Sequence, residues 1–150
     1  QKKRVPLLEL SYDIDKKHFE DLGPDTKQLS ILGICDLVAA DWDSILIIPP
    51  YILMSRIDSL ELKNFSSIED EVENLSYHDG KTTLLFTKSN EVIGYSSVSR
   101  RPVDFSKLIL PPSRYYGIIR KSECQDIYIE KKQFKIGASY NIFKAQDVKE

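Results

Sequence analysis

The chain has 150 residues and a formal net charge of −2; 41% of its residues are hydrophobic and 29% are charged. This composition suits one folded domain over residues 1–150 and excludes a disordered chain, a collagen or a disulfide-dense miniprotein. No apolar run approaches the roughly 20 residues of a membrane-spanning helix. The 21 basic residues are balanced by 23 acidic ones, so we expect neither a membrane span nor a nucleic-acid partner.

The first third of the sequence predicts a strand, a helix and a second strand. Residues 5–14 alternate loosely between apolar and polar side chains, which is typical of a strand. Apolar residues then recur at steps of three and four over residues 27–40, which predicts an amphipathic helix. Residues 44–48 are apolar on both faces and are followed by two prolines. We expect them to form a central strand that is covered on both sides.

The middle of the chain changes from a helical period to a strand period. Residues 51–62 fit a short helix, and residues 67–76 follow a capping signature at Ser66-Ser67, with acidic residues three positions later. From residue 81 the period becomes two, which predicts a hairpin of strands 82–88 and 91–99.

The last third continues the strand pattern. Residues 102–114 hold three prolines and are interpreted as a long loop, followed by a strand over residues 115–121. A second hairpin is expected from residues 125–130 and 133–140, turning at Lys131-Lys132. The order of elements indicates an α+β fold with a mainly antiparallel sheet, helices packed on one face, and most helices in the N-terminal half. Residues 1–4 and 144–150 are expected to be flexible ends.

Two features bear on cellular location. The sequence begins at Gln1 and its only methionine is Met54. We expect that an export signal has been removed, the alternative being that the sequence is a piece of a longer chain. Cys35 and Cys124 are the only cysteines. In an exported protein they would form a disulfide, although two unrelated thiols fit the sequence equally well.

Charge is unevenly distributed along the chain. Residues 56–80 hold seven acidic side chains against two basic ones, whereas residues 81–121 hold eight basic against two acidic. Arginine and tyrosine are enriched at interaction hot spots, so the basic segment predicts a partner-binding surface. Its residues are Arg100, Arg101, Arg114, Tyr95, Tyr115 and Tyr116. The alternative binding surface is the acidic helix, with Glu69, Asp70, Glu71 and Glu73.

No pattern of catalytic or ligand-binding residues emerges. His18 and His78 lack neighbours at metal-ligand spacing, and Cys35 sits within an apolar stripe that does not favour a reactive thiolate. A serine-hydrolase elbow and a glycine-rich phosphate loop are both absent from the sequence. We therefore predict no metal, no cofactor and no enzymatic activity.

Two segments carry a resemblance. Residues 41–51, which read DWDSILIIPPY, and residues 84–95, which read LLFTKSNEVIGY, resemble small exported bacterial domains of unassigned role with a W-D…P-P-Y motif. In length, start and general character the whole chain is similar to periplasmic bacteriocin immunity proteins of the pesticin immunity type. It lacks the S-G-x-x-Y loop of periplasmic lysozyme inhibitors, so none of their inhibitory residues is carried over.

These resemblances imply a periplasmic, non-catalytic binding protein. Its most concrete form is an immunity protein that occludes the active site of a peptidoglycan-degrading toxin. It would bind that active site through the basic surface around Arg100 and Arg101. Muramidase-type glycosidases work with paired carboxylates, and arginine pairs with carboxylates in a bidentate manner. The alternatives are an envelope accessory or lipoprotein-like domain without inhibitory role, and a nuclease-toxin immunity protein that binds through its acidic helix.

Overall fold

The strands of this protein form two stacked sheets. The computed structural model describes residues 4–99, 103–109 and 115–144. The central sheet has the order β4-β3-β2-β6, and the outer sheet has the order β1-β7-β8-β5. All pairings within them are antiparallel except that of β5 with β8. The central-sheet strands are β2 (Ser44–Ile48), β3 (Lys81–Lys88), β4 (Glu91–Ser99) and β6 (Gly117–Arg120). The outer-sheet strands are β1 (Lys27–Ile31), β5 (Val103–Asp104), β7 (Ile127–Gln133) and β8 (Ala138–Lys144).

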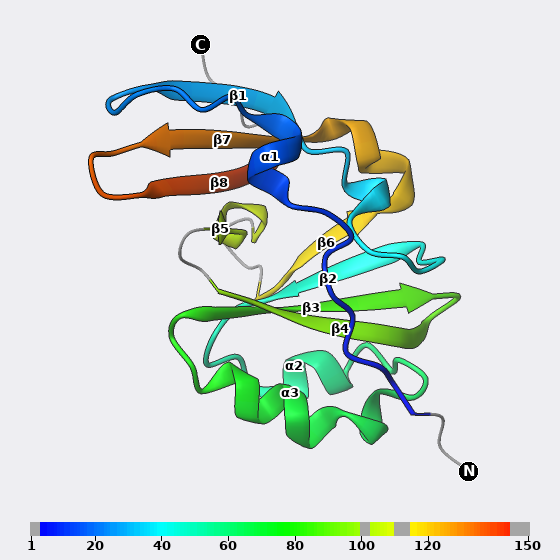
Figure 1. Cartoon of the computed structure of the whole chain (residues 1–150). Coiled ribbons are helices and arrows are strands. Elements are labelled where there is room, and N and C mark those ends of the chain that lie inside the picture. Colours follow the sequence, from blue (N-terminus) through cyan, green and yellow to red (C-terminus); the bar gives the residue numbers. More distant parts are fainter. Residues whose placement is uncertain (1–3, 100–102, 110–114, 145–150) are drawn as a thin grey trace.

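Short helices connect the strands. The α-helices are α1 (Ile14–His18), α2 (Met54–Asp58) and α3 (Glu69–Ser76). The 3₁₀-helices are η1 (Ile34–Asp36), η2 (Phe65–Ser67), η3 (Ser106–Leu108) and η4 (Lys121–Asp126). Figure 1 shows the outer sheet above the central sheet and α2 and α3 below it, so the molecule has three layers. Within the described residues no helix is long and apolar enough to cross a membrane.

The central sheet is buried on both faces because its strands are apolar on both. Along β2, Ile45 and Ile47 join the cluster facing the outer sheet, whereas Leu46 and Ile48 join the cluster facing the helices. Each strand therefore contributes to two hydrophobic layers, as a near-continuous apolar run requires. The prediction that residues 44–48 form a central strand covered on both sides is confirmed.

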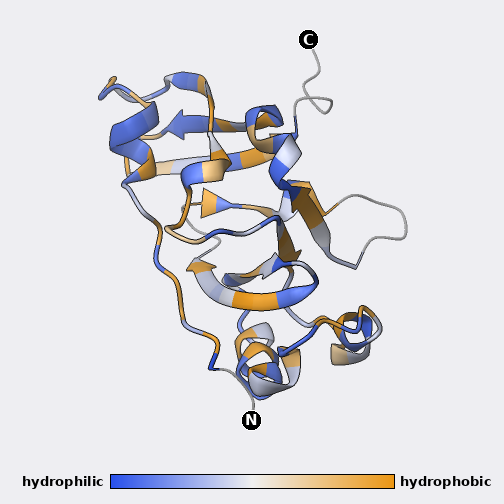
Figure 2. Cartoon of the chain, turned by 90° about the vertical axis from the view of Figure 1, so that its right-hand side faces the viewer, coloured by the Kyte–Doolittle hydropathy of each residue, from blue (hydrophilic) through white to orange (hydrophobic). Residues whose placement is uncertain are grey.

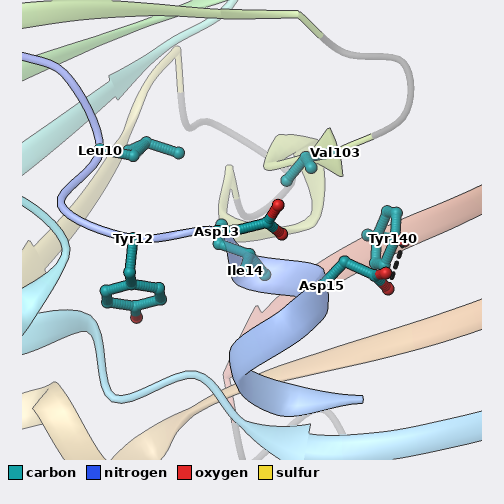
Figure 3. Close-up of a pocket in the computed structure, with 7 residues that line it drawn as sticks. All are labelled: Leu10, Tyr12, Asp13, Ile14, Asp15, Val103 and Tyr140. Carbon is teal, nitrogen blue, oxygen red and sulfur yellow. Dashed lines mark hydrogen bonds between the residues drawn. The ribbon is translucent and has the colours of Figure 1, made fainter. Parts of the chain in front are cut away.

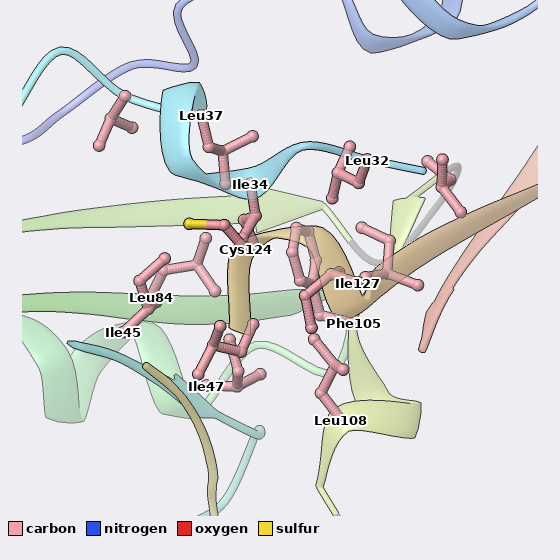
Figure 4. Packing of buried hydrophobic residues seen from close by; sticks show 14 of the residues in the cluster. Leu32, Ile34, Leu37, Ile45, Ile47, Leu84, Phe105, Leu108, Cys124 and Ile127 are labelled. Carbon is pink, nitrogen blue, oxygen red and sulfur yellow. The ribbon is translucent and has the colours of Figure 1, made fainter. Parts of the chain in front are cut away.

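The larger hydrophobic cluster lies between the sheets and includes Cys124 (Figure 4). Cys35 and Cys124 are bonded, with their Cα atoms 5.3 Å apart, within the range that a disulfide requires. Cys35 lies in η1, which follows the outer strand β1, and Cys124 lies in η4, between β6 and β7. The bridge therefore fastens the crossover from one sheet to the other.

The α+β class, the antiparallel pairing and the first hairpin are confirmed. Ser89 and Asn90 form the turn of this hairpin and both have positive φ, 49° and 64°, as a tight primed turn requires. Residues 67–76 are largely helical as predicted, with α3 beginning at Glu69. The predicted capping box is absent: no side chain caps α3, and the Ser67 hydroxyl donates to the Asn64 carbonyl instead.

The predicted helix over residues 27–40 is wrong. Residues 27–31 form β1, which alternates between exposed and half-buried positions and pairs with β7. Gly33 then adopts the left-handed conformation, with φ of 64°, and this interrupts any helix. The apolar pattern correctly indicated burial, since Leu32, Ile34, Leu37 and Val38 are buried. These residues lie in a largely irregular segment after β1 and not in an α-helix.

Two boundaries in the remaining chain also differ from expectation. Residues 5–14 form no strand; Leu7 makes one parallel bridge to Tyr95, and α1 begins at Ile14. The second hairpin does not turn at Lys131-Lys132, because β7 continues to Gln133. The left-handed residue of its turn is Gly137, with φ of 82°. Figure 2 shows α1 as a largely hydrophilic helix beside the outer sheet, where no sequence pattern placed one.

Candidate functional site

The predicted basic surface is only partly described by the structure. Arg100, Arg101 and Arg114 lie outside the described residues. Tyr95 is half-buried in β4 at one edge of the central sheet, and Tyr116 is half-buried beside β6 at the other edge. Tyr115 is 49% exposed. Two strands therefore separate Tyr95 from the other two tyrosines, and only Tyr115 presents a broad face to solvent.

The predicted acidic surface lies on α3 and extends to α2. Asp70 and Glu71 are exposed, whereas Glu69 and Glu73 are half-buried. Desolvation raises the pKa of Glu69, and a hydrogen bond to Asp58 of α2 adds to this effect. The two helices thus place carboxylates from both elements on one side of the molecule.

A surface hollow of about 360 Å³ lies where β2 ends. Pro49 and Pro50 stop the strand because proline cannot donate to the ladder. Tyr51 follows with φ of 61°, a left-handed conformation that is rare for a bulky side chain. Its N–H donates to the Ser76 carbonyl at 2.6 Å. Its phenol hydrogen-bonds to Asp79, which raises the pKa of Tyr51. The aromatic ring is therefore fixed in position while remaining 60% exposed.

The other wall of the hollow carries a cation on an aromatic ring. The guanidinium carbon of Arg56 lies 3.7 Å from the ring centroid of Tyr115, a geometry that pre-orients the planar guanidinium. Arg56 is exposed and makes no ion pair with any residue in the described part of the chain. Leu53, 65% exposed, and Ile109 complete the apolar lining. We call Tyr51, Leu53, Arg56 and Tyr115 the Arg–Tyr hollow.

This arrangement is suited to binding a protruding group of another molecule. Exposed tyrosine and leucine supply apolar contact area, and an arginine that forms no ion pair with the described residues can donate to a carboxylate in a bidentate manner. Sequence reasoning identified Tyr115 but missed Arg56, Tyr51 and Leu53. A usable signal was present, since Pro49-Pro50-Tyr51 places a bulky residue just beyond a buried strand. Arg56 was overlooked because it opens the segment over residues 56–80, which is acidic overall.

Cysteine and histidine chemistry is limited in the described structure. Cys35 is held in the disulfide, so it offers no thiolate. His78 is exposed next to a turn, whereas His18 lies 3.5 Å from the Tyr12 hydroxyl and 3.3 Å from the Ser30 hydroxyl. Burial lowers the pKa of His18, with a smaller contribution from Lys17. Among the described side chains no group of three histidine, cysteine or acidic residues is placed to hold a metal ion.

Comparison with known proteins gives no relative: no family model, no curated protein and no solved structure matches this chain.

Proposed function

We propose that this protein is a non-catalytic binding protein of the bacterial envelope and that it acts as an immunity protein, neutralising a peptidoglycan-degrading toxin. The observation that carries the proposal is that Arg56, at the edge of a hollow with exposed Tyr51 and Leu53, stacks on Tyr115 and forms no ion pair with a described residue. The disulfide supports an oxidising compartment such as the periplasm.

The hollow offers a chemically specific way to block a glycosidase. A muramidase-type active site presents two carboxylates in an open groove. Arg56 would pair with one of them, while Tyr51 and Leu53 fill the apolar part of the groove. Because Arg56 is already stacked on Tyr115, little side-chain entropy remains to be lost on docking. Arg100, Arg101 and Arg114, which lie outside the described residues, remain predicted partner-binding residues.

The test measures inhibition of a partner captured from an envelope extract with the purified chain as bait. We expect one stoichiometric hydrolase whose lysis of peptidoglycan the chain blocks. Arg56→Glu should weaken inhibition about a hundredfold, as expected for a central hot spot. Lys135→Glu, the same reversal at an exposed position in the β7–β8 turn, should leave it unchanged. If the two variants inhibit equally well, the hollow is not the inhibitory surface.

A second candidate function uses the acidic surface. The Asp58–Glu69 contact concentrates negative charge between α2 and α3, which suits a cationic partner such as a nuclease toxin. Charge reversal at Asp70 and Glu71 separates the two functions: it weakens binding of a nuclease and leaves inhibition of a muramidase intact. Recovery of a multi-protein scaffold in place of a hydrolase would favour the envelope accessory role over both.

A further inference from the structure

A second cavity, of about 270 Å³, lies on the other side of the central sheet from α2 and α3. It is formed where the chain entering α1 passes β5 and β8. Leu10, Ile14 and Val103 give it apolar walls, and Tyr12, Asp13, Asp15 and Tyr140 supply its polar atoms. Figure 3 shows the Asp13 carboxylate directed towards Val103 and the Asp15 carboxylate beside Tyr140.

Asp15 is held firmly but only through one of its oxygens. Its Oδ1 accepts hydrogen bonds from Lys131 Nζ at 2.7 Å and from the Tyr140 hydroxyl at 2.6 Å. No described residue donates to Oδ2. The Lys131 side chain is 5% exposed and the Asp15 side chain 46%. The buried lysine therefore holds Oδ1 of Asp15, while the half-exposed carboxylate leaves Oδ2 accessible.

Asp13 adds a second carboxylate, which forms no ion pair with any described residue. As the N-cap of α1, its Oδ1 accepts from the Lys16 N–H at 3.1 Å. Its other oxygen has no donor among the described residues. Burial raises the pKa of Tyr140, the hydrogen bond to Asp15 raises it further, and the charges of Asp15 and Asp13 add smaller contributions. Asp13 lines the same cavity as Asp15 and Tyr140. Lys131 compensates for one of the two carboxylates, and the cavity keeps the charge of the other.

We propose that this cavity binds a primary ammonium group carried on a short apolar chain. The ammonium would donate to the open oxygens of Asp13 and Asp15, and its alkyl stem would lie against Leu10, Ile14 and Val103. A metal ion does not fit these walls, because the described residues give it no set of three ligands and hard cations need an oxygen shell. A free alkylamine and a lysine side chain carry this same chemistry.

The test is NMR titration of the whole chain with n-butylammonium and, in parallel, n-butanol. We expect saturable shifts at Leu10, Ile14 and Val103, with butanol binding about tenfold more weakly because it lacks the charge-assisted hydrogen bonds. Equal affinities for the two compounds, or no shift at these residues, would overturn the proposal.

Asp13→Asn is the decisive variant, because asparagine caps a helix as well as aspartate does while removing the charge. It should weaken butylammonium binding about tenfold. Asp126→Asn, at an exposed carboxylate in η4, should not change it. Val103→Phe, which fills the cavity, should abolish binding, and retention of binding by this folded variant would also overturn the proposal.

A second titration identifies the source of the ammonium. Nα-acetyl-lysine methylamide binding more tightly than butylammonium indicates a lysine side chain of a partner protein, and the reverse order indicates a free amine. This cavity is separate from the Arg–Tyr hollow, so failure here leaves the proposed function standing.

Discussion

The buried lysine of the outer sheet shows how a single side chain can fix a helix that has little intrinsic stability. α1 has five residues, too few to persist alone. It is held because Asp15 reaches Lys131 in β7 and Tyr140 in β8. Lys131 sits in a strand at a position that faces inward, and no charge pattern in the sequence distinguished it from its exposed neighbour Lys132.

The two partners of this ion pair should respond differently to replacement. Asp15→Asn leaves the Lys131 charge buried without a counter-ion, which we expect to lower the free energy of unfolding by about 2 kcal/mol, discounted for the partial exposure of Asp15. Lys131→Met leaves a carboxylate that water can reach and should cost about 1 kcal/mol or less. Urea unfolding at neutral pH measures both. A larger loss for Lys131→Met would show that the lysine is not effectively desolvated.

The same pair should make stability depend on pH. The hydrogen bond from Lys131 lowers the pKa of Asp15, and that from Tyr140 lowers it further. A carboxyl group with a lowered pKa in the folded state stabilises the protein above its unfolded pKa of about 3.9 and loses that contribution as pH falls through its folded pKa. Wild type and Asp15→Asn should therefore differ by a constant amount from pH 7 to about pH 5 and converge below about pH 4. A difference that persists unchanged in acid would contradict this account.

At the scale of elements, the sequence correctly predicted the helices and strands for which the hydrophobic period and the residues at the ends indicated the same structure. β2, the β3–β4 hairpin and α3 are of this kind. The segment over residues 27–40 failed because its helical spacing competed with pairing to β7 and with Gly33, and tertiary contact decided the outcome. The hollow was predicted only through Tyr115. Pro49-Pro50 marks the end of β2 and so signals Tyr51, but the position of Arg56 beside Tyr115 depends on how α2 packs after that end, which no local pattern encodes.

A close approach between two elements depends on one glycine. A Cβ atom added to Gly117, at the start of β6, would lie 2.5 Å from the Leu108 carbonyl oxygen of η3. That oxygen belongs to the backbone and has little room to move, so Gly117→Ala should lower the free energy of unfolding by about 1–3 kcal/mol. Gly80→Ala is the matched control, since nothing lies within 4 Å of its added Cβ. Thermal unfolding of the two variants compares them, and equal stabilities would mean that η3 is not packed on β6 as described.

At the scale of the whole molecule, the disulfide joins the segments that carry the chain between its two sheets. The bonded cysteines are 89 residues apart in sequence, and closing such a long loop stabilises the folded state by about 4 kcal/mol in the chain-entropy model. Cys35→Ala/Cys124→Ala should lose about 2–4 kcal/mol of unfolding free energy. The Arg–Tyr hollow lies away from the bridge, so the variant should bind the partner with unchanged affinity at a temperature where it stays folded. Lost affinity in a folded variant would place the binding surface near the bridge.

We propose that this molecule recognises its partner through the Arg–Tyr hollow. Hydrogen–deuterium exchange of the chain with and without the captured partner tests it most directly, because exchange maps the contact surface without altering any side chain. We expect the partner to slow exchange of the amides over residues 51–58, around α2, and to leave exchange in the exposed turn between β7 and β8 unchanged. Slowed exchange confined to the outer sheet, with residues 51–58 unaffected, would contradict it.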